Sequence, residues 1–467
     1  MKKLLLLLYI GLPAILSTGQ SQNLPKDTTG ITCWITTADQ SVLLKQLPVI
    51  PFGQGHLQPH VIMVDSSVRY QTIDGFGFAL TGGSASLINS LDSMKKETLL
   101  KELFGSEVNS IGISYLRISI GASDLSARDF TYDEMPAGQT DQELEQFSIG
   151  MEKTDLIPIL KKILFLQPGL KILGSPWTAP TWMKSGRSYT GGSLLHACYG
   201  CYARYFVKYI QAMAREGIPI DAITPQNEPL FGGNNPSMLM NASEEADFIK
   251  NYLGPEFRKA RINTRIIVYD HNADRPDYPL SILADSAAAK FVDGSAFHLY
   301  GGEITALGKV HMAQPGKNVY FTEQWVGGPE NFAVDLRWHV KTLIIGASRN
   351  WSRNVLEWNL ASDPAYNPHT VGGCNTCLGG ITIGREITRN VGYFIIGHAS
   401  KFVSPGSVRI ASNEAPPLEN VAFLTPEGKK VLIVLNDSSA KENFSIVSGD
   451  RSAVVSLDAG AVATCVW

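Results

Sequence analysis

Eight short apolar runs recur along the chain, and helical patterns lie between them. Strands that alternate with amphipathic helices pair in parallel, because each helix returns the chain to the same edge of the sheet. Eight such units are the number that closes a (β/α)8 TIM barrel. The predicted strands are residues 72–80, 113–120, 170–175, 220–224, 265–269, 295–299, 318–322 and 354–358.

The intervening segments carry apolar residues at helical spacing, and several open on a Ser or Asp that suits an N-cap. The clearest of these predicted helices are residues 93–104, 155–166, 201–215 and 243–259. Short strands separated by turn residues flank the barrel on both sides, which predicts a β-sandwich built from both chain ends. The predicted divisions are a signal peptide over 1–22, N-terminal sandwich strands within 23–71, the barrel over 72–397 and the C-terminal sandwich over 398–467.

The first residues have the composition of a secretory signal peptide. Met1, Lys2 and Lys3 precede an apolar stretch that runs to Leu16 and ends in small polar residues. Roughly 13 apolar residues are too few for a stable membrane-spanning helix. We therefore expect export to the periplasm or the extracellular space, without stable membrane insertion.

The overall charge argues against nucleic acid as a partner. The 467 residues include 40 basic and 43 acidic side chains with a formal net charge of -3, and no long block of one sign. A protein that binds DNA or RNA usually presents a basic surface. A small neutral substrate fits this charge better.

Six cysteines suit an oxidising compartment but are too few for a disulfide scaffold. If the first and last sandwich strands pair, Cys33 and Cys465 come close enough for a disulfide. The other four form two pairs with the spacing of zinc ligands, and zinc, local disulfides and free thiols are all compatible with that spacing. These pairs are Cys198 with Cys201 and Cys374 with Cys377.

Two glutamates stand just after predicted strands, Glu228 after the fourth and Glu323 at the end of the seventh. Catalytic groups of such barrels sit at the carboxyl ends of the strands, so these two carboxylates are expected to face each other across one pocket. Two facing carboxylates, roughly 5–5.5 Å apart, are the catalytic groups of a retaining glycosidase. Asn227, beside Glu228, offers an amide that can bind a sugar hydroxyl or the nucleophile without adding charge.

The chain resembles glycoside hydrolase family 30, which contains lysosomal acid β-glucosidase (glucosylceramidase) and β-1,6-glucanases. The segments that carry the resemblance are DGFGFALT at 74–81, SPWTAPTWMK at 175–184, NEP at 227–229, FTE at 321–323 and PEGKKVLIVLND at 426–437. The resemblance implies that Glu228 is the acid/base and Glu323 the nucleophile of a double displacement. The double displacement implied by this resemblance requires no cofactor and no metal.

The same resemblance extends the predicted site to substrate-binding residues. Arg117 resembles the arginine that holds the nucleophile's carboxylate, although an ion pair at the barrel floor suits it equally well. Trp177 and Trp358 resemble aromatics of the sugar-binding subsite. His298 and Tyr300 alternate around Leu299 and correspond to a histidine and a tyrosine near the nucleophile, whereas His271 and Asn272 are expected only at the rim.

The predicted activity is hydrolysis of β-glucosidic bonds in β-1,6-glucan or a related β-glucoside. Lysosomal members carry an aspartate after the first-strand threonine, where this chain has Gly82, which argues against glucosylceramide. The same motifs are also compatible with a glucosylceramidase, with a β-xylosidase, β-fucosidase or β-galactanase of the same family, and with a non-catalytic carbohydrate-binding protein.

Overall fold

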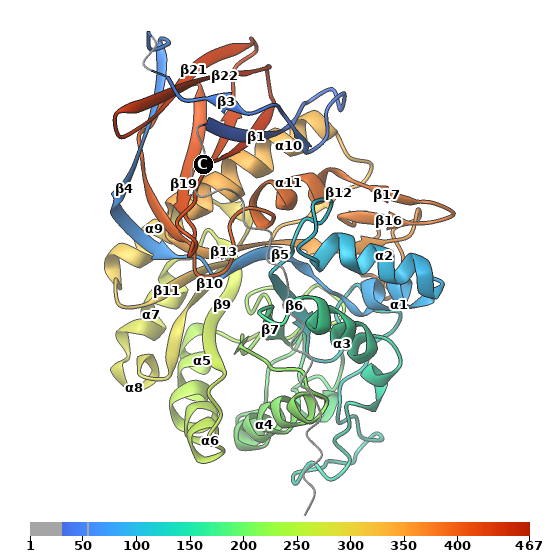
Figure 1. The fold of residues 1–467 in the computed structure, drawn as a ribbon. Helices are drawn as coiled ribbons and strands as arrows, with labels where there is room; N and C mark the ends of the chain where they lie inside the picture. The colour runs from blue at the N-terminus through green and yellow to red at the C-terminus, as the bar shows by residue number, and fades with distance from the viewer. Residues whose placement is uncertain (1–29, 54–55) are drawn as a thin grey trace, which may run out of the picture.

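A closed barrel of eight parallel strands forms the centre of the molecule (Figure 1). The computed structural model describes residues 30–53 and 56–467. All eight predicted strands are confirmed, and each lies beside its expected neighbours. The strands are β5 (Gly75–Ala79), β6 (Tyr115–Ser119), β7 (Lys171–Ser175), β8 (Ala222–Ile223), β9 (Arg265–Ala273), β10 (Val292–Gly302), β11 (Asn318–Glu323) and β13 (Ser352–Asn359).

The barrel interior is filled by side chains in layers. One buried layer contains one residue from each of seven strands, namely Tyr115, Leu173, Ala222, Ile267, Ala296, Tyr320 and Leu356. Near Tyr320, Asp74 accepts hydrogen bonds from Arg265 and Arg353. Arg117 lies two residues beyond Tyr115 on β6, which places it on the same face and nearer the carboxyl ends. The interpretation of Arg117 as part of a barrel-floor ion pair is therefore wrong.

Helices surround the barrel, and local sequence sets several of their ends. Asp92 caps one helix by accepting hydrogen bonds from the amides of Met94 and Lys95. The helix predicted over 243–259 widens into a π turn, Ile249–Leu253, just before Pro255, whose ring nitrogen lacks a hydrogen for the regular ladder. The helices are α1 (Gly82–Ser90), α2 (Ser93–Phe104), α3 (Leu156–Leu166), α4 (Tyr199–Arg215), α5 (Ala242–Phe248), α6 (Gly254–Lys259), α7 (Asp277–Ala284), α8 (Ser286–Ala289), α9 (Thr305–Ala313), α10 (Phe332–His339) and α11 (Val391–Ser400).

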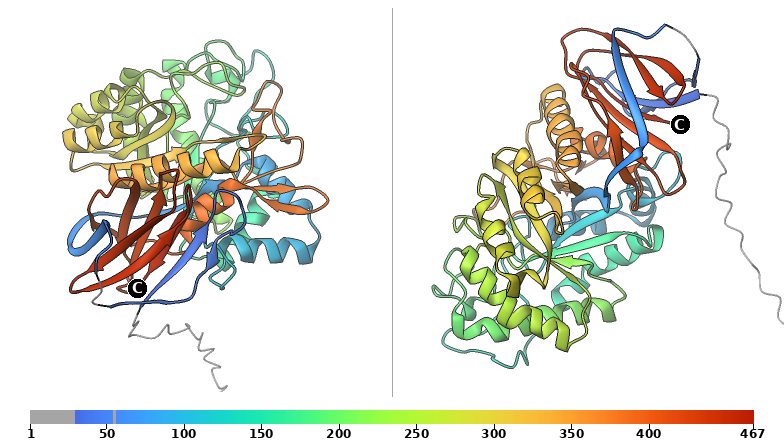
Figure 2. Two further views of the ribbon diagram at one scale, coloured as in Figure 1. Left: turned by 90° about the horizontal axis from the view of Figure 1, so that it is seen from above. Right: turned by 90° about the vertical axis from the view of Figure 1, so that its left-hand side faces the viewer.

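Both chain ends build the second domain, which lies beside the barrel (Figure 2). Its strands are β1 (Gly30–Thr36), β2 (Lys45–Gln46), β3 (Ile50–Pro51), β4 (His60–Thr72), β18 (Val408–Ser412), β19 (Leu418–Leu424), β20 (Lys430–Asn436), β21 (Glu442–Ser448), β22 (Arg451–Leu457) and β23 (Val462–Val466). The first part of β4 pairs with β21 and the later part with β18. Strand β4 therefore joins the two parts of the β-sandwich.

The first and last strands of this domain are neighbours, as predicted. β1 and β23 are antiparallel, with Cys33 opposite Cys465, and these two residues form a disulfide. Behind this pair, the imidazole of His398 on α11 lies within hydrogen-bond distance of Thr36 and Thr464. These contacts fix the sandwich to a barrel helix, so the two domains share a packed interface.

The remaining cysteines do not form a zinc site. Cys374 and Cys377 form a second disulfide, whereas Cys198 and Cys201 are buried free thiols. The interpretation of the four cysteines as a zinc site is wrong, because Cys374 and Cys377 are bonded to each other and have no thiolate that could bind zinc. Two small sheets adjoin this region. One pairs β12 (Val326–Gly327) with β15 (Cys377–Leu378), and the other contains β14 (Ala361–Ser362), β16 (Ile381–Ile383) and β17 (Ile387–Arg389).

The signal peptide predicted over 1–22 lies outside the described residues. Within residues 30–53 and 56–467, none of the helices has the length and apolar character needed to cross a membrane.

Candidate active site

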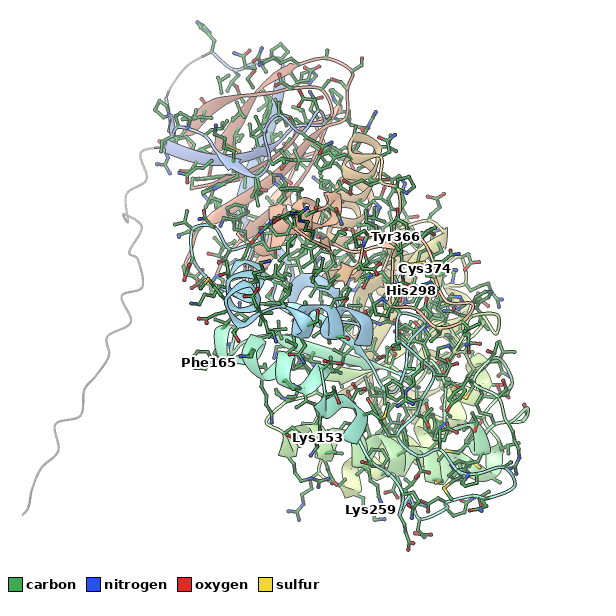
Figure 3. The ribbon with its side chains drawn as sticks, turned by 90° about the vertical axis from the view of Figure 1, so that its right-hand side faces the viewer. Lys153, Phe165, Lys259, His298, Tyr366 and Cys374 are labelled. Carbon is green, nitrogen blue, oxygen red and sulfur yellow. A yellow bond between two sulfur atoms is a disulfide. The ribbon has the colours of Figure 1, made fainter. Side chains whose placement is uncertain are left out.

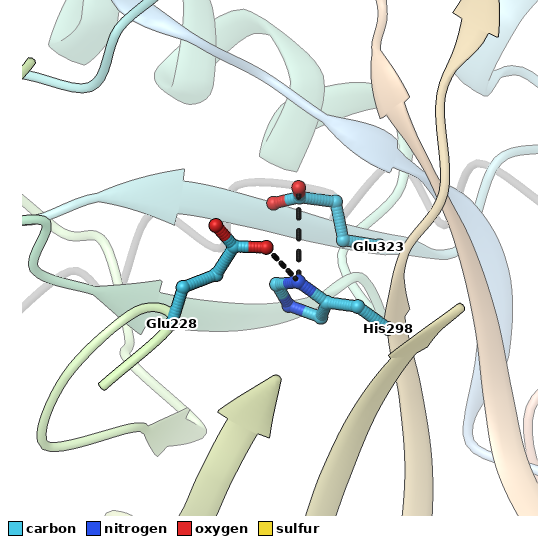
Figure 4. A group of neighbouring side chains, drawn as sticks. All are labelled: Glu228, His298 and Glu323. Atoms are coloured by element: carbon cyan, nitrogen blue, oxygen red, sulfur yellow. Dashed lines mark hydrogen bonds and ion pairs between the residues drawn. The ribbon is translucent and has the colours of Figure 1, made fainter. Parts of the chain in front are cut away.

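Glu228 and Glu323 meet at the carboxyl ends of the barrel strands. Glu323 is the last residue of β11, and Glu228 lies in the loop after β8. The backbone of Glu228 has a positive φ of 46°, which is uncommon for a residue other than glycine, and its amide donates to the carbonyl of Asp270. One oxygen of each carboxylate lies within 4.8 Å of the other, with His298 between them (Figure 4).

Arg117 connects the end of β11, which carries Glu323, to the loop after β8, which carries Asn227 and Glu228. Its Nη1 donates to Glu323 Oε2 at 2.5 Å, and its Nη2 donates to Asn227 Oδ1 at 2.6 Å and to Asp270 Oδ2 at 2.8 Å. The side chain is completely buried. The expected contact between this arginine and Glu323 is therefore present, and Asn227 is oriented by the same guanidinium.

Asp270, which sequence reasoning missed, is the central acceptor of the site. Besides Arg117 it accepts from Ser175 Oγ at 2.5 Å, Thr224 Oγ1 at 2.8 Å and Thr322 Oγ1 at 2.7 Å. Burial acts to raise the pKa of Asp270, but the Arg117 charge and the hydrogen bonds hold that pKa well below its usual range. The available signal was an aspartate directly after the predicted range 265–269; the strand runs on to Ala273 and so includes Asp270.

His298 on β10 lies against all three carboxylates. Its Nε2 is 3.1 Å from Asp270 Oδ1, and its Nδ1 is 3.1 Å from Glu228 Oε1 and 3.8 Å from Glu323 Oε1. Burial acts to lower the pKa of His298, but the Glu323 charge and the hydrogen bonds to Asp270 and Glu228 raise it to about 9. His298 is therefore an imidazolium at neutral pH, and both ring nitrogens donate.

The two glutamates respond differently to this environment. Burial acts to raise the pKa of Glu228, but the hydrogen bond and charge of His298 produce a net lowering. Burial also raises the pKa of Glu323, and the lowering by His298 and Arg117 does not cancel it. The Tyr300 hydroxyl donates to Glu323 Oε1 at 2.9 Å, so Glu323 receives two strong donors on its two oxygens.

The rim residues His271 and Asn272 support neighbouring loops. The amide of Leu230 donates to His271 Nδ1 at 3.4 Å, and the amide of Tyr300 donates to Asn272 Oδ1 at 3.0 Å. These contacts connect the loop after β8 to the end of β9, and the end of β9 to the end of β10. Both residues therefore hold the walls of the site, in agreement with their expected place at the rim.

The glutamates open into a cavity of about 410 Å³ at the mouth of the barrel. Trp177 and Trp358 line it and stack on each other with ring centroids 5.3 Å apart. The Arg117 guanidinium lies 4.7 Å from the Trp177 ring centroid. Both tryptophans are buried, so only a small part of each ring is open to the cavity.

Asp124, from the loop after β6, gives this cavity a further carboxylate that sequence reasoning missed. Its side chain is buried, and its Oδ1 has no hydrogen-bond partner among the described residues. Burial, together with the charges of Glu323 and Glu228, raises the pKa of Asp124 to about 7. Gly82 begins α1, and a Cβ atom placed on it would lie 3.1 Å from Ser126 Oγ. The inference from this glycine against glucosylceramide stays a prediction.

Glu228, His298 and Glu323 are also the described residues whose donor atoms come close enough to hold a metal ion. A metal would need the lone pair of a neutral imidazole. His298 instead carries a proton on Nδ1 that faces the two glutamates. The contacts present among these three residues are those of an ion-pair network, with His298 within hydrogen-bond distance of Glu228.

Comparison with known proteins places this geometry among the glycosyl hydrolases. Residues 73–403 match the model of the glycosyl hydrolase family 30 TIM-barrel domain, and residues 406–465 match the family 30 beta sandwich domain. The chain is 35% identical over 399 residues to endo-1,6-beta-D-glucanase neg1 of Aspergillus fumigatus, covering 79% of this chain and 80% of that protein. It is 29% identical over 429 residues to the lysosomal acid glucosylceramidase of Mus musculus, covering 85% and 82%.

The solved structure of the endo-beta1,6-glucanase BT3312 superimposes with a TM-score of 0.88 at 33% identity, covering 94% of this chain and 99% of that chain. The likeness therefore extends over both domains.

Asp270→Asn should lower the free energy of unfolding by at least about 3 kcal/mol at pH 7, because Arg117 and His298 would stay buried with less opposing charge. The lowered pKa of Asp270 stabilises the folded protein above about pH 4, which is the ordinary pKa of an aspartate in an unfolded chain. This stabilisation is lost as the pH falls further. Urea unfolding at pH 7 measures the change. The exposed Asp274→Asn, just after the end of β9, is the matched control. Wild-type stability in Asp270→Asn would contradict the central role of this carboxylate.

Proposed function

The chain belongs to glycosyl hydrolase family 30, and on this premise we propose that it cleaves β-glucosidic bonds with retention of configuration. It is a glycoside hydrolase, so the interpretation as a non-catalytic binding protein loses its basis. In the proposed mechanism Glu323 is the nucleophile and Glu228 the acid/base.

The distance between the two carboxylates carries the proposal. Their nearest oxygens lie within 4.8 Å. Retaining glycosidases hold the two carboxyl groups roughly 5–5.5 Å apart, whereas inverting ones leave roughly 6.5–9.5 Å for a water molecule. The short separation supports direct attack by a carboxylate on the sugar.

The surroundings of each glutamate support the assignment of roles. Arg117 and Tyr300 donate to separate oxygens of Glu323, which fixes its carboxylate at the end of a rigid strand. Glu228 lies in a loop and pairs with the protonated His298. A fixed, hydrogen-bonded carboxylate suits the nucleophile, and a carboxylate with a proton within reach suits the acid.

The charges of the site supply the proton for the first step. Three carboxylates, on Glu228, Asp270 and Glu323, face two cations, Arg117 and His298. The proton on His298 Nδ1 is one hydrogen bond away from Glu228. Its transfer to Glu228 leaves a neutral imidazole and a carboxylic acid that can protonate the leaving oxygen.

The reaction then balances in two displacements. As Glu323 attacks the anomeric carbon, the bond to the leaving oxygen breaks and that oxygen takes the proton of Glu228. Glu228, now ionised, removes a proton from water, and the water oxygen displaces Glu323 from the sugar. Each displacement inverts the anomeric carbon, so the product keeps the β configuration.

We propose β-1,6-glucan or a related β-glucoside as the substrate. Similarity to a fungal endo-1,6-beta-D-glucanase at 35% identity, against 29% for the murine glucosylceramidase, supports this choice. The cavity supports a sugar, since the Oδ1 of Asp124, which has no partner among the described residues, can accept a hydrogen bond from a hydroxyl in a cavity also lined by Trp177 and Trp358.

Export to the periplasm or the extracellular space is part of the proposal. The composition of residues 1–22 predicts a signal peptide. The disulfides Cys33–Cys465 and Cys374–Cys377 support an oxidising compartment, because cytosolic thiols are kept reduced.

The roles of the two glutamates predict different defects. Glu228→Gln should lower kcat/KM on a substrate with a poor leaving group by about 10²–10⁴-fold, because general acid catalysis is lost. It should largely spare the first step on a dinitrophenyl β-glucoside, and azide should restore turnover by forming the β-glycosyl azide. Glu323→Gln should abolish turnover of both substrates, and azide should give no β product.

Steady-state kinetics with product analysis by NMR separate these outcomes. The exposed Glu303→Gln, on the loop after β10, is the matched control and should retain wild-type rates. Equal losses in Glu228→Gln and Glu323→Gln on every substrate would overturn the assignment of roles.

The proposed substrate predicts a clear preference. We expect kcat/KM on β-1,6-linked gluco-oligosaccharides to exceed that on glucosylceramide, and on β-1,3- or β-1,4-linked oligosaccharides, by at least about tenfold, a difference of about 1.4 kcal/mol. Competition assays on mixed substrates measure these ratios directly. A tenfold preference for glucosylceramide would make the enzyme a glucosylceramidase instead.

A further inference from the structure

Phe231 is a large apolar side chain in an unexpected place. It lines the cavity together with Glu228, yet about half of its surface, 50%, is exposed. A phenylalanine is usually buried, because burial of its ring is favourable by roughly 1.5–3 kcal/mol. An exposed ring beside a catalytic cavity is therefore a candidate for contact with a ligand.

The ring is attached to the same tight turn as Glu228. The amide of Phe231 donates to the carbonyl of Glu228 at 2.9 Å, and the amide of Leu230 donates to His271 Nδ1 at 3.4 Å. The amide of Met240 closes the loop further on by donating to the carbonyl of Pro229 at 2.9 Å. These bonds hold the position of Phe231 relative to Glu228.

A glycine supports one side of this ring. A Cβ atom placed on Gly233 would lie 3.0, 3.2 and 3.7 Å from Cζ, Cε2 and Cε1 of Phe231. The distal end of the ring therefore lies beside Gly233, and a side chain at that position would push the ring away. This contact holds the end of the ring and leaves the exposed half of its surface for a ligand.

An exposed aromatic face suits the ring of a sugar. The carbon-bound hydrogens of a β-glucosyl unit form an apolar face that packs on an aromatic ring, while its hydroxyls need polar partners. The cavity provides polar groups near Phe231 in the side chain of Asn234 and the peptide groups of Gly372 and Gly373. This mixture of one ring face and polar groups matches a saccharide better than an alkyl chain.

The link to Glu228 indicates which sugar the ring contacts. An acid/base residue protonates the oxygen of the leaving group, so the leaving sugar must lie beside Glu228. Phe231 is three residues away in the same turn. We propose that Phe231 is the stacking platform of a leaving-group subsite, which binds a second sugar ring of a β-glucan.

This subsite rests on the proposed function and adds to it a preference for saccharide over lipid leaving groups. The subsite also predicts a transfer activity. A sugar bound there can attack the glycosyl-enzyme in place of water: its hydroxyl oxygen bonds to the anomeric carbon, the bond to Glu323 breaks, and the hydroxyl proton passes to Glu228.

Variants at position 231 test the subsite. For Phe231→Ala, the ratio of kcat/KM on a β-1,6-linked glucose trisaccharide to kcat/KM on a dinitrophenyl β-glucoside should fall about tenfold. Phe231→Tyr, which keeps the ring, should retain the ratio. Phe165→Ala is the matched control, because Phe165 on α3 is 85% exposed and lies well away from His298 and Cys374 (Figure 3).

Transfer provides a second readout. With the dinitrophenyl β-glucoside as donor and a β-1,6-linked glucose disaccharide as acceptor, the ratio of transfer to hydrolysis should also fall about tenfold in Phe231→Ala. Phe231→Leu, which keeps an apolar side chain without a ring, should show the same loss and replaces the alanine variant if that one folds poorly.

Several results would overturn the subsite. These are an unchanged substrate ratio in Phe231→Ala, equal losses on both substrates, or a loss confined to glucosylceramide, which would make the ring a lipid contact. The wild-type enzyme separates this failure from that of the proposed function. Wild-type enzyme that leaves β-1,6-glucan intact contradicts the substrate, whereas wild-type cleavage with an unchanged ratio in Phe231→Ala contradicts only the subsite.

Discussion

The buried ion pair between Arg117 and Asp270 is the interaction on which the rest of the site depends. Both side chains are completely buried, so each charge requires the other, as well as Glu323 and His298, to compensate for the loss of water. The guanidinium sets the positions of Glu323 and Asn227, and Asp270 sets that of His298. The two glutamates thus take their places from a network fixed before any substrate binds, which is the preorganisation that electrostatic catalysis requires.

The barrel makes this network possible because its parallel strands deliver residues distant in sequence to one layer. Arg117, Asp270, His298 and Glu323 come from four different strands. The hydroxyls of Ser175 on β7 and Thr322 on β11 also donate hydrogen bonds to Asp270. The sandwich contributes stability from outside. Its disulfide and its contacts with α11 tie both chain ends to the barrel without approaching the cavity.

Much of this arrangement follows from sequence. Each barrel strand is a run of apolar residues between helical patterns, so all eight were predictable. Glu228 and Glu323 were recognisable because a charged residue just after a buried strand is a strong local signal. Asp270 and Asp124 were missed because their importance depends on partners on other strands and loops, such as Arg117, which lies 153 residues before Asp270. The positive φ of Glu228 and the contact of the Phe231 ring with Gly233 depend on loop geometry that no periodic pattern encodes.

Covalent trapping tests the central claim, that Glu323 attacks the sugar while Glu228 handles the proton. A 2-deoxy-2-fluoro β-glucoside with a dinitrophenyl leaving group slows the breakdown of the glycosyl-enzyme more than it slows release of the activated leaving group. Mass spectrometry of the digested protein should then find one fluoroglucosyl group on the peptide that contains Glu323, and none in Glu323→Gln. Attachment to Glu228, or turnover of the fluoroglucoside without any adduct, would contradict the account.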